Sequence, residues 1–350
     1  MVSRPSSSRE NTSRSKRRPN NHQSIALFPT LRLFAVVFLS FATISQLFQS
    51  TTNMQSGVAA AKAAISATAK QSYKLLKKKQ LSHDSFLLRY AIPEGRILGT
   101  DPLLPTCIKI NYQPTIEGHK ALSKSYSPVS HPNQSGYFDL VVKAYPYQEG
   151  GGVGKYLCDM EVGSSITGKL KGERMMHGSP QVIGRGWKHI GLVAGGTGIA
   201  PLLQIARIAL ESSTPEEKPR VHLLFINHTS KDILGKDEIE ELAREHPDHF
   251  FVTHSFTRPE DDDETIGECP VGSKFATGRG DAALAKKALP KPSPGETMVL
   301  VCGRDGFVAH WAGPVTRAPT TDGSKGPKIQ GPLLGVLAEA GFTADQVFKY

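Results

Sequence analysis

Two glycine-rich turns are the parts of this 350-residue chain whose residue types and spacing most directly suggest chemistry. The first, residues 191–201 (GLVAGGTGIAP), runs from an apolar strand through glycines into a helix. Glycines let the backbone approach a phosphate closely, and the free N–H groups at a helix start attract an anion. The pattern is neither a Walker A loop nor the G-x-G-x-x-G dinucleotide fingerprint. By itself it leaves two interpretations open: a nucleotide cradle and a turn without a ligand.

A second glycine turn, residues 298–307 (MVLVCGRDGF), follows the last predicted strand. In an open α/β sheet, ligands bind at the carboxyl ends of the strands, so the two turns could form opposite sides of one crevice. Cys302 could face that crevice, or it could be a small buried hydrophobic residue, which is the commoner role of a lone cysteine.

The periodic pattern of apolar residues around these turns predicts the strands and helices that position them. From His189 onward, strands alternate with helices, which predicts a doubly wound parallel α/β unit. The predicted strands are residues 188–194, 221–227, 250–256 and 298–302, and the predicted helices are 199–210 and 231–245. Earlier, short alternating or β-branched runs between Pro and Gly residues predict a small antiparallel barrel or sandwich. These runs are residues 86–90, 106–112, 137–145 and 164–170.

The charge of the chain is concentrated at its N-terminus. The formal net charge is +10, but residues 1–80 hold 13 Lys/Arg and one acid, which leaves a charge of −2 for residues 81–350. A nucleic-acid-binding domain would cluster basic residues on its folded surface, so we expect no nucleic-acid partner. The four cysteines are too few and too widely spaced for a disulfide framework or a zinc ribbon. We expect free thiols and no metal site.

The N-terminal segment predicts a targeting or anchoring device. Residues 1–24 read as disordered, and residues 25–48 are strongly apolar. This apolar stretch fits a membrane anchor, which we favour, or a cleaved signal. Residues 56–79 are rich in Ala and Lys and have good helix propensity, which fits a stalk or the end of a targeting region. The predicted location is a mitochondrial membrane (outer membrane or intermembrane space) or the endoplasmic reticulum.

Several motifs in order resemble the NADH-cytochrome b5 reductase family of ferredoxin-reductase-type flavoenzymes. The resemblance covers about residues 81–350, and the order of the motifs is more specific than any one of them. The motifs are residues 124–129 (KSYSPV), 136–146 (GYFDLVVKAYP), 195–201 (GGTGIAP), 223–234 (LLFINHTSKDIL) and the pair Cys302-Gly303.

The resemblance implies an FAD-binding β-barrel domain over residues 81–184, with FAD contacts from an Arg-x-Tyr-Ser/Thr motif. Tyr126 and Ser127 match that motif, whereas Lys124 stands in place of the arginine and lacks its bidentate fork. Gly154 stands in place of a serine in the segment whose amides hold the pyrophosphate. The implied FAD-binding residues are Lys124, Ser125, Tyr126, Ser127, Val141, Lys143, Tyr145, Gly151, Gly152, Val153 and Gly154.

The resemblance implies an NAD(P)-binding α/β domain over residues 185–350. The implied residues on this side are Gly195, Gly196, Thr197, Gly198, Pro201, Cys302, Gly303, Phe307 and Tyr350. Ser127 is the candidate for tuning the flavin, and Cys302 is the candidate for positioning the hydride donor. Thr257 stands about where the family often has an aspartate that disfavours NADPH. We therefore expect NADH and leave NADPH open.

The function implied by the resemblance is hydride transfer from NADH to FAD, followed by single-electron transfer to a small haem protein such as cytochrome b5. The flavin carries the chemistry, so no general acid or base is expected. Alternatives are a quinone or an oxygenase component as acceptor, or a membrane-tethered interaction module without catalysis. We expect a monomer. The Gly/Pro-rich segment 311–330 reads as a surface loop or a partner contact.

Overall fold

The computed structural model describes residues 63–64, 70–114, 120–145, 152–172, 174–259, 273–322, 324 and 326–350. The chain divides into two units, Met1–Ala61 and Lys62–Tyr350, and every described residue belongs to the second. The predicted apolar anchor at 25–48 and Gly151 lie outside the described residues. Among the helices of the described ranges, none has the length and apolarity to cross a membrane.

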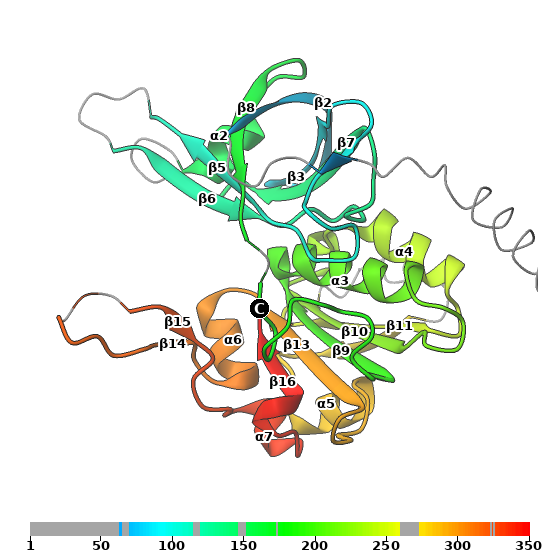
Figure 1. Cartoon of the computed structure of the whole chain (residues 1–350). Coiled ribbons are helices and arrows are strands. Elements are labelled where there is room, and N and C mark those ends of the chain that lie inside the picture. Colours follow the sequence, from blue (N-terminus) through cyan, green and yellow to red (C-terminus); the bar gives the residue numbers. More distant parts are fainter. Residues whose placement is uncertain are drawn as a thin grey trace, which may run out of the picture. The chain divides into compact units, whose positions relative to one another are not determined.

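The first half of the described chain forms a curled six-stranded antiparallel sheet in the order β6-β5-β8-β2-β3-β7 (Figure 1). Its aromatic core stacks Tyr90 on Phe138 and sets Tyr73 edge-on to the same ring. The elements are β2 (Gln71–Ser82), β3 (Ser85–Ala91), β5 (Ile108–Tyr112), β6 (Leu122–Tyr126), β7 (Tyr137–Lys143), the helix α2 (Val153–Asp159) and β8 (Ser165–Leu170). The short strands β1 (Ala63–Ala64) and β4 (Arg96–Ile97) pair in parallel.

Strand β2 corrects the prediction of a helical stalk. Residues 71–82 form a strand, and Tyr73 and Leu75 are buried between exposed neighbours in the alternation that a half-buried strand requires. One end of β2 pairs with β8 and the rest pairs with β3. These long-range backbone hydrogen bonds override the local helix propensity of the lysine-rich stretch. The stalk prediction is therefore wrong for residues 71–79, which belong to the antiparallel sheet.

The second half forms a six-stranded parallel sheet in the order β12-β11-β10-β9-β13-β16. Its strands are β9 (His189–Gly195), β10 (Arg220–Asn227), β11 (Phe250–Phe256), β12 (Lys274–Thr277), β13 (Thr297–Cys302) and β16 (Val347–Lys349). Its helices are α3 (Ile199–Glu211), α4 (Lys236–Glu245), α5 (Ala282–Ala288), α6 (Asp305–Ala312) and α7 (Val336–Glu339). The four strands and two helices predicted in this half are all present. The helix predicted at 231–245 begins only at Lys236, after a short 3-10 turn at Ser230–Asp232, and the other ends shift by at most one residue.

Helices cover both faces of the parallel sheet. Leu192 of β9 packs in a core with α3 and α4, whereas the next residue, Val193, packs in a second core with α5, α6 and α7. Successive residues of a strand point to opposite faces, so this alternation shows that the sheet is buried on both sides. The predicted doubly wound architecture is confirmed.

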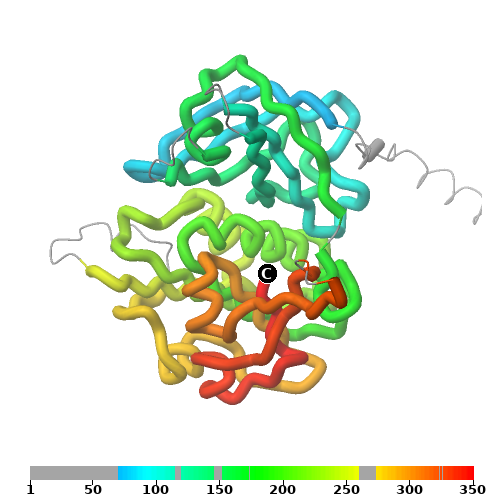
Figure 2. The backbone as a smooth tube through the Cα atoms, turned by 90° about the vertical axis from the view of Figure 1, so that its left-hand side faces the viewer, coloured from blue at the N-terminus to red at the C-terminus, as the bar shows by residue number. Residues whose placement is uncertain are grey.

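The segment predicted as a loop at 311–330 begins inside the fold. Trp311 and Ala312 close α6 and are fully buried. Beyond them, the short strands β14 (Thr316–Arg317) and β15 (Lys328–Ile329) pair as an antiparallel ribbon. The red chain end lies against the orange segment that follows α6 (Figure 2), and Gln330 hydrogen-bonds to Lys349 there.

Candidate active site

The two glycine turns lie in direct contact. A Cβ atom on Gly198 would overlap the carbonyl oxygen of Cys302, so the first turn packs directly against the end of β13. Cβ atoms on Gly195 and Gly303 would lie 2.8 and 2.6 Å from the ring of Phe307. Only glycine allows such close approach, so these three positions are sterically required.

A cavity of about 500 Å³, which we call the glycine-turn cavity, opens beside the two turns. Both turns line it, together with residues at the carboxyl ends of β10, β11 and β12 and residues near the ends of β2 and β7. The lining residues include Ser82, Ser85, Lys143, Tyr145, Gly195, Gly196, Thr197, Asn227, His228, Asp232, Thr257, Arg279, Arg304, Gly306, Phe307 and His310. This places the cavity where ligands bind in open α/β sheets.

Asn227, at the end of β10, carries an unpaired donor beside this cavity. The residue is 6% exposed, and its Nδ2 atom has no hydrogen-bond partner among the described residues. A buried amide without a partner costs about 1–3 kcal/mol, so the position fits an acceptor supplied by a ligand.

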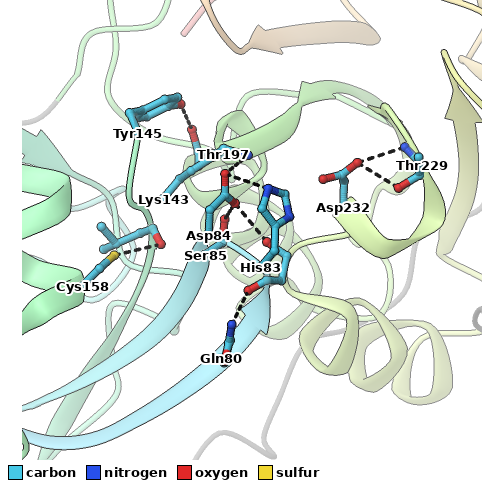
Figure 3. A network of polar contacts seen from close by, with 12 residues as sticks. Gln80, His83, Asp84, Ser85, Lys143, Tyr145, Cys158, Thr197, Thr229 and Asp232 are labelled. Carbon is cyan, nitrogen blue, oxygen red and sulfur yellow. Dashed lines mark hydrogen bonds and ion pairs between the residues drawn. The ribbon is translucent and has the colours of Figure 1, made fainter. Parts of the chain in front are cut away.

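A network around Asp84 positions Lys143 at the cavity wall (Figure 3). The Lys143 ammonium lies 2.8 Å from Asp84 Oδ2, and the hydroxyls of Ser82 and Ser85 donate to Asp84 Oδ1. Burial opposes ionisation of Asp84, but these hydrogen bonds outweigh it and lower the pKa of the carboxyl group. The charged pair holds the ammonium in one place.

Two cationic side chains lie near the ring of Tyr145 at the same cavity. The Tyr145 hydroxyl lies 3.2 Å from Thr197 Oγ1 of the first turn (Figure 3). The Lys124 ammonium lies 4.9 Å from the centre of its ring, and the Arg304 guanidinium lies 5.8 Å away. Two cations around one aromatic ring, with Lys143 nearby, fit a ligand that carries phosphate groups.

Tyr126 of β6 and Gly154 of α2 lie close together in the FAD-binding half of the chain. Burial raises the pKa of Tyr126, and its hydroxyl has no hydrogen-bond partner among the described residues. A Cβ atom on Gly154 would lie 2.6 Å from Lys143 O and 3.6 Å from the Tyr126 hydroxyl, whereas one on Gly152 would meet nothing within 4 Å. The unpaired hydroxyl and the open backbone at Gly152 both fit an FAD pyrophosphate region.

A second cavity of about 640 Å³, the C-terminal cavity, contains Ser127 and Tyr350. The lining residues are Pro105, Cys107, Ser127, Lys171, Gly172, Arg174, Met175, His177, Lys328, Ile329, Gln330, Phe348 and Tyr350. The Arg174 guanidinium lies 4.7 Å from the ring centre of Tyr350 and donates to Lys349 O at 3.0 Å. The chain end is thereby held in place beside Ser127.

A buried lysine anchors one wall of the C-terminal cavity. Lys349 is 2% exposed, and its ammonium donates to the carbonyls of Pro314 (3.1 Å), Gln330 (2.5 Å) and Pro332 (2.8 Å). Burial lowers its pKa. The Gln330 amide also bonds to both Lys349 N and Lys349 O, much as an added strand would. These bonds hold the segment after α6 against the sheet edge.

The predicted site residues lie in two cavities, and some of them line neither. Lys143, Tyr145, Gly195, Gly196, Thr197 and Phe307 line the glycine-turn cavity, and Ser127 and Tyr350 line the C-terminal cavity. Burial raises the pKa of Cys302 to about 11, so its thiol is neutral. Val141, Val153 and Pro201 are buried and line neither cavity.

The sequence analysis missed several residues of the glycine-turn cavity, among them Asn227, Arg279 and Arg304. Their positions at or just after the carboxyl ends of β10 and β13 were a usable signal for Asn227 and Arg304. Lys349 lies in the C-terminal run 346–350 (QVFKY), which also resembles the ending of the family, but nothing in the sequence indicated that its side chain is buried.

Comparison with known proteins matches both halves of the chain. The model of the oxidoreductase FAD-binding domain matches residues 72–175, and that of the oxidoreductase NAD-binding domain matches residues 192–312. The NADH-cytochrome b5 reductase 1 of Lodderomyces elongisporus is 37% identical over 235 residues, which cover 67% of this chain and 69% of that protein. The human NADH-cytochrome b5 reductase 2 is 30% identical over 300 residues, which cover 81% and 95%.

Among solved structures, the cytochrome b5 reductase domain of Ulva prolifera nitrate reductase shares the fold. It superposes with a TM-score of 0.60 at 23% identity and covers 82% of this chain and 99% of its own.

Proposed function

The chain belongs to the NADH-cytochrome b5 reductase family, and we propose that its two cavities have different roles. The glycine-turn cavity binds the nucleotide, and the C-terminal cavity serves electron transfer. The protein binds FAD and NADH and passes electrons from NADH through FAD to cytochrome b5. FAD, when bound, would supply the chemistry that links a two-electron hydride donor to a one-electron acceptor. The observation that carries the division is that the two predicted glycine turns line one cavity, whereas Ser127 and Tyr350 line the other.

On the FAD side, the antiparallel sheet supplies cations and one buried donor. The Lys124 ammonium, 4.9 Å from the centre of the Tyr145 ring, would offset charge on the pyrophosphate, and Lys143, held by Asp84, would add N–H donors. The Tyr126 hydroxyl, which lacks a protein partner among the described residues, donates to the cofactor. Ser125, Val141, Gly151, Gly152, Val153 and Gly154 complete the proposed binding segment.

On the NADH side, the backbone does most of the binding. The N–H groups of Gly195, Gly196 and Thr197 face the phosphates, and Arg304 adds a positive charge. The Asn227 amide donates to an acceptor of the dinucleotide. Gly198 and Pro201 hold the backbone of the turn in place through packing.

Two residues position the reacting groups. The Ser127 hydroxyl lies at the wall of the C-terminal cavity and orients the reactive end of the flavin. Cys302 keeps a neutral thiol at the end of β13, beside Gly303, and would position the hydride donor by packing, without exchanging a proton. Tyr350 excludes water from the same region.

The N-terminal segment of the chain tethers the protein to a mitochondrial membrane or to the endoplasmic reticulum, and the protein acts as a monomer. Residues 25–48 are strongly apolar, and six basic residues precede them. A fluorescent reporter fused to residues 1–61, which end before the first strand of the antiparallel sheet, tests this part. Co-localisation with either membrane is expected, and a soluble cytosolic reporter would contradict it.

The central test uses the purified full-length protein under anaerobic conditions. We expect a flavin absorption spectrum that bleaches on addition of NADH and recovers on addition of oxidised cytochrome b5, with reduced haem formed. Ser127→Ala should slow bleaching while the FAD content stays unchanged. A folded protein that stays colourless after incubation with FAD would instead favour an interaction module.

A further inference from the structure

The segment after α6 folds back so that its two ends lie in close contact. A Cβ atom on Gly331 would lie 2.7 Å from Pro314 O. A Cβ atom on Gly313 would lie 2.8 Å from Pro332 O. Both glycines adopt positive φ angles, 65° and 83°, which other residues rarely accept. We call these four residues, together with Gln330, the loop base. The ribbon of β14 and β15 lies between its two halves.

The ammonium of Lys349 lies among the carbonyl oxygens of the loop base. It donates to Pro314 O, Gln330 O and Pro332 O, and no carboxylate of the described residues pairs with it. Removing an ammonium from water without a counter-ion costs several kcal/mol, which these charge-assisted hydrogen bonds must offset. Carbonyl dipoles that face one another repel unless a cation lies between them. The ammonium therefore holds the two halves of the loop base together.

Strand β16 connects this lysine to the C-terminal cavity. Val347 packs with α5, α6 and α7, whereas Phe348 and Tyr350 pack with the core on the other face of the parallel sheet. Successive residues of a strand alternate between faces, so the Lys349 side chain lies on the Val347 side and the Tyr350 ring on the opposite side. Fixing the backbone at Lys349 therefore also fixes the next side chain, which lines the cavity together with Ser127.

The peptide group between Lys349 and Tyr350 is held by two parts of the chain. β16 is the last strand of the described sheet, and on its outer edge the Gln330 amide bonds to Lys349 N (2.7 Å) and Lys349 O (3.1 Å). Arg174, which follows the antiparallel sheet, donates to the same oxygen at 3.0 Å. Its guanidinium also lies 4.7 Å from the ring centre of Tyr350. The loop base and the first half of the chain thus meet directly before the Tyr350 ring.

We propose that Lys349 is a positioning residue for flavin reduction, which acts by fixing the loop base on β16 and thereby holding the Tyr350 ring beside Ser127. Without the ammonium, the loop base loosens and the ring shifts, so the residues around it orient the reacting groups less well. The positioning role rests on the proposed function, since it concerns a step of that reaction. It goes beyond that function because the loop base and Lys349 lie outside the residues that either family model matches.

The first test measures anaerobic flavin bleaching in the full-length holoenzyme over a range of NADH concentrations. Lys349→Met should lower the limiting rate constant about tenfold, as a misplaced reacting group does. The half-saturating NADH concentration should change by less than about twofold, because the glycine turns still bind the dinucleotide. A merely structural loss would not produce this split. Lys287→Met, which replaces an exposed lysine of α5, is the matched control and should leave both values unchanged.

The second test asks whether Lys349 acts through Tyr350. In a Tyr350→Ala background, Lys349→Met should lower the limiting rate constant by less than about twofold, because the ring that it positions is gone. Gln330→Ala removes the amide bonds to β16 and leaves the ammonium in place, so it provides the same comparison if Lys349→Met does not fold.

Two results would overturn the positioning role. One is an unchanged limiting rate constant in the folded variant, and the other is an equal effect with and without the Tyr350 ring. An unmodified protein whose flavin is not bleached by NADH would instead contradict the proposed function itself.

Discussion

The antiparallel and parallel sheets build their parts of the site by different means. The antiparallel sheet presents side chains from its strands, such as Lys124 and Tyr126 on β6. The parallel sheet presents backbone at its strand ends, where Gly195, Gly198 and Gly303 pack against neighbours with no room for a Cβ atom. An exposed side chain can be exchanged without disturbing its strand, whereas a close-packed glycine cannot. Lys124, which departs from the family pattern, is such an exposed side chain, whereas Gly154 is a close-packed glycine within the FAD-binding unit.

Gly198→Ala should have the largest effect, because it changes a close-packed glycine at a strand end of the parallel sheet. The new methyl group overlaps the Cys302 carbonyl, and overpacking of this kind costs about 1–3 kcal/mol of stability unless the turn moves. Because the moved turn would misplace the bound NADH, flavin bleaching should slow by about 100-fold. Stopped-flow absorbance measures the rate. FAD content should stay unchanged because the substitution lies outside the antiparallel sheet.

Gly306→Ala is the matched control for folding. A Cβ atom there meets nothing within 4 Å, so the melting temperature should not change. A Gly198→Ala protein that reduces its flavin at the normal rate would show that the contact between the turns is not needed.

Acid should weaken the parallel sheet through buried histidines. His254 is 1% exposed, and burial among Phe225, Phe256 and Phe275, with a smaller contribution from Lys236, lowers its pKa from 6.5 to about 4. Between these values the unfolded chain binds more protons, so stability is present above about pH 6.5 and is lost as the pH falls towards 4. The loss from His254 between pH 7 and pH 5 should be about 2 kcal/mol.

Urea unfolding at the two pH values measures this loss. Burial also lowers the pKa of His222 to about 4, so His254→Phe should remove about half of the combined pH dependence. A His254→Phe protein with an unchanged pH dependence would contradict this account.

Gly154→Ser tests whether the antiparallel sheet tolerates the family residue. A Cβ atom 2.6 Å from Lys143 O would force the start of α2 away from β7, at a cost of about 1–2 kcal/mol. FAD should therefore bind about tenfold more weakly, as measured by recovery of flavin fluorescence on dilution. Tighter binding would mean that the lost hydroxyl matters more than the packing.

Lys124→Arg should have the smallest effect. Lys124 is exposed, so replacement by the bidentate guanidinium should tighten FAD binding by only about threefold. The same fluorescence titration measures it, with Lys109→Arg on β5 as the control. A change of more than tenfold in either direction would show that Lys124 is a dominant contact.

The sequence by itself determined the two sheets, their order and the glycine turns. Alternation, βαβ rhythm and turn glycines are patterns of consecutive residues, so they can be read without knowing what lies beside them in space. This is why β9, β11 and α3 were predicted within a residue or two. The motifs of the FAD and NAD sides were read in the same way.

The tertiary structure alone decided the contacts between distant segments. Strand β2 forms because residues 71–74 pair with β8, far along the chain, against their local helix propensity. Lys349 is buried because carbonyls of the segment after α6 surround its ammonium. His228, Thr257 and Arg279 converge because three parallel strands end at one edge. Each depends on packing free energy between segments, which no local pattern of residues encodes.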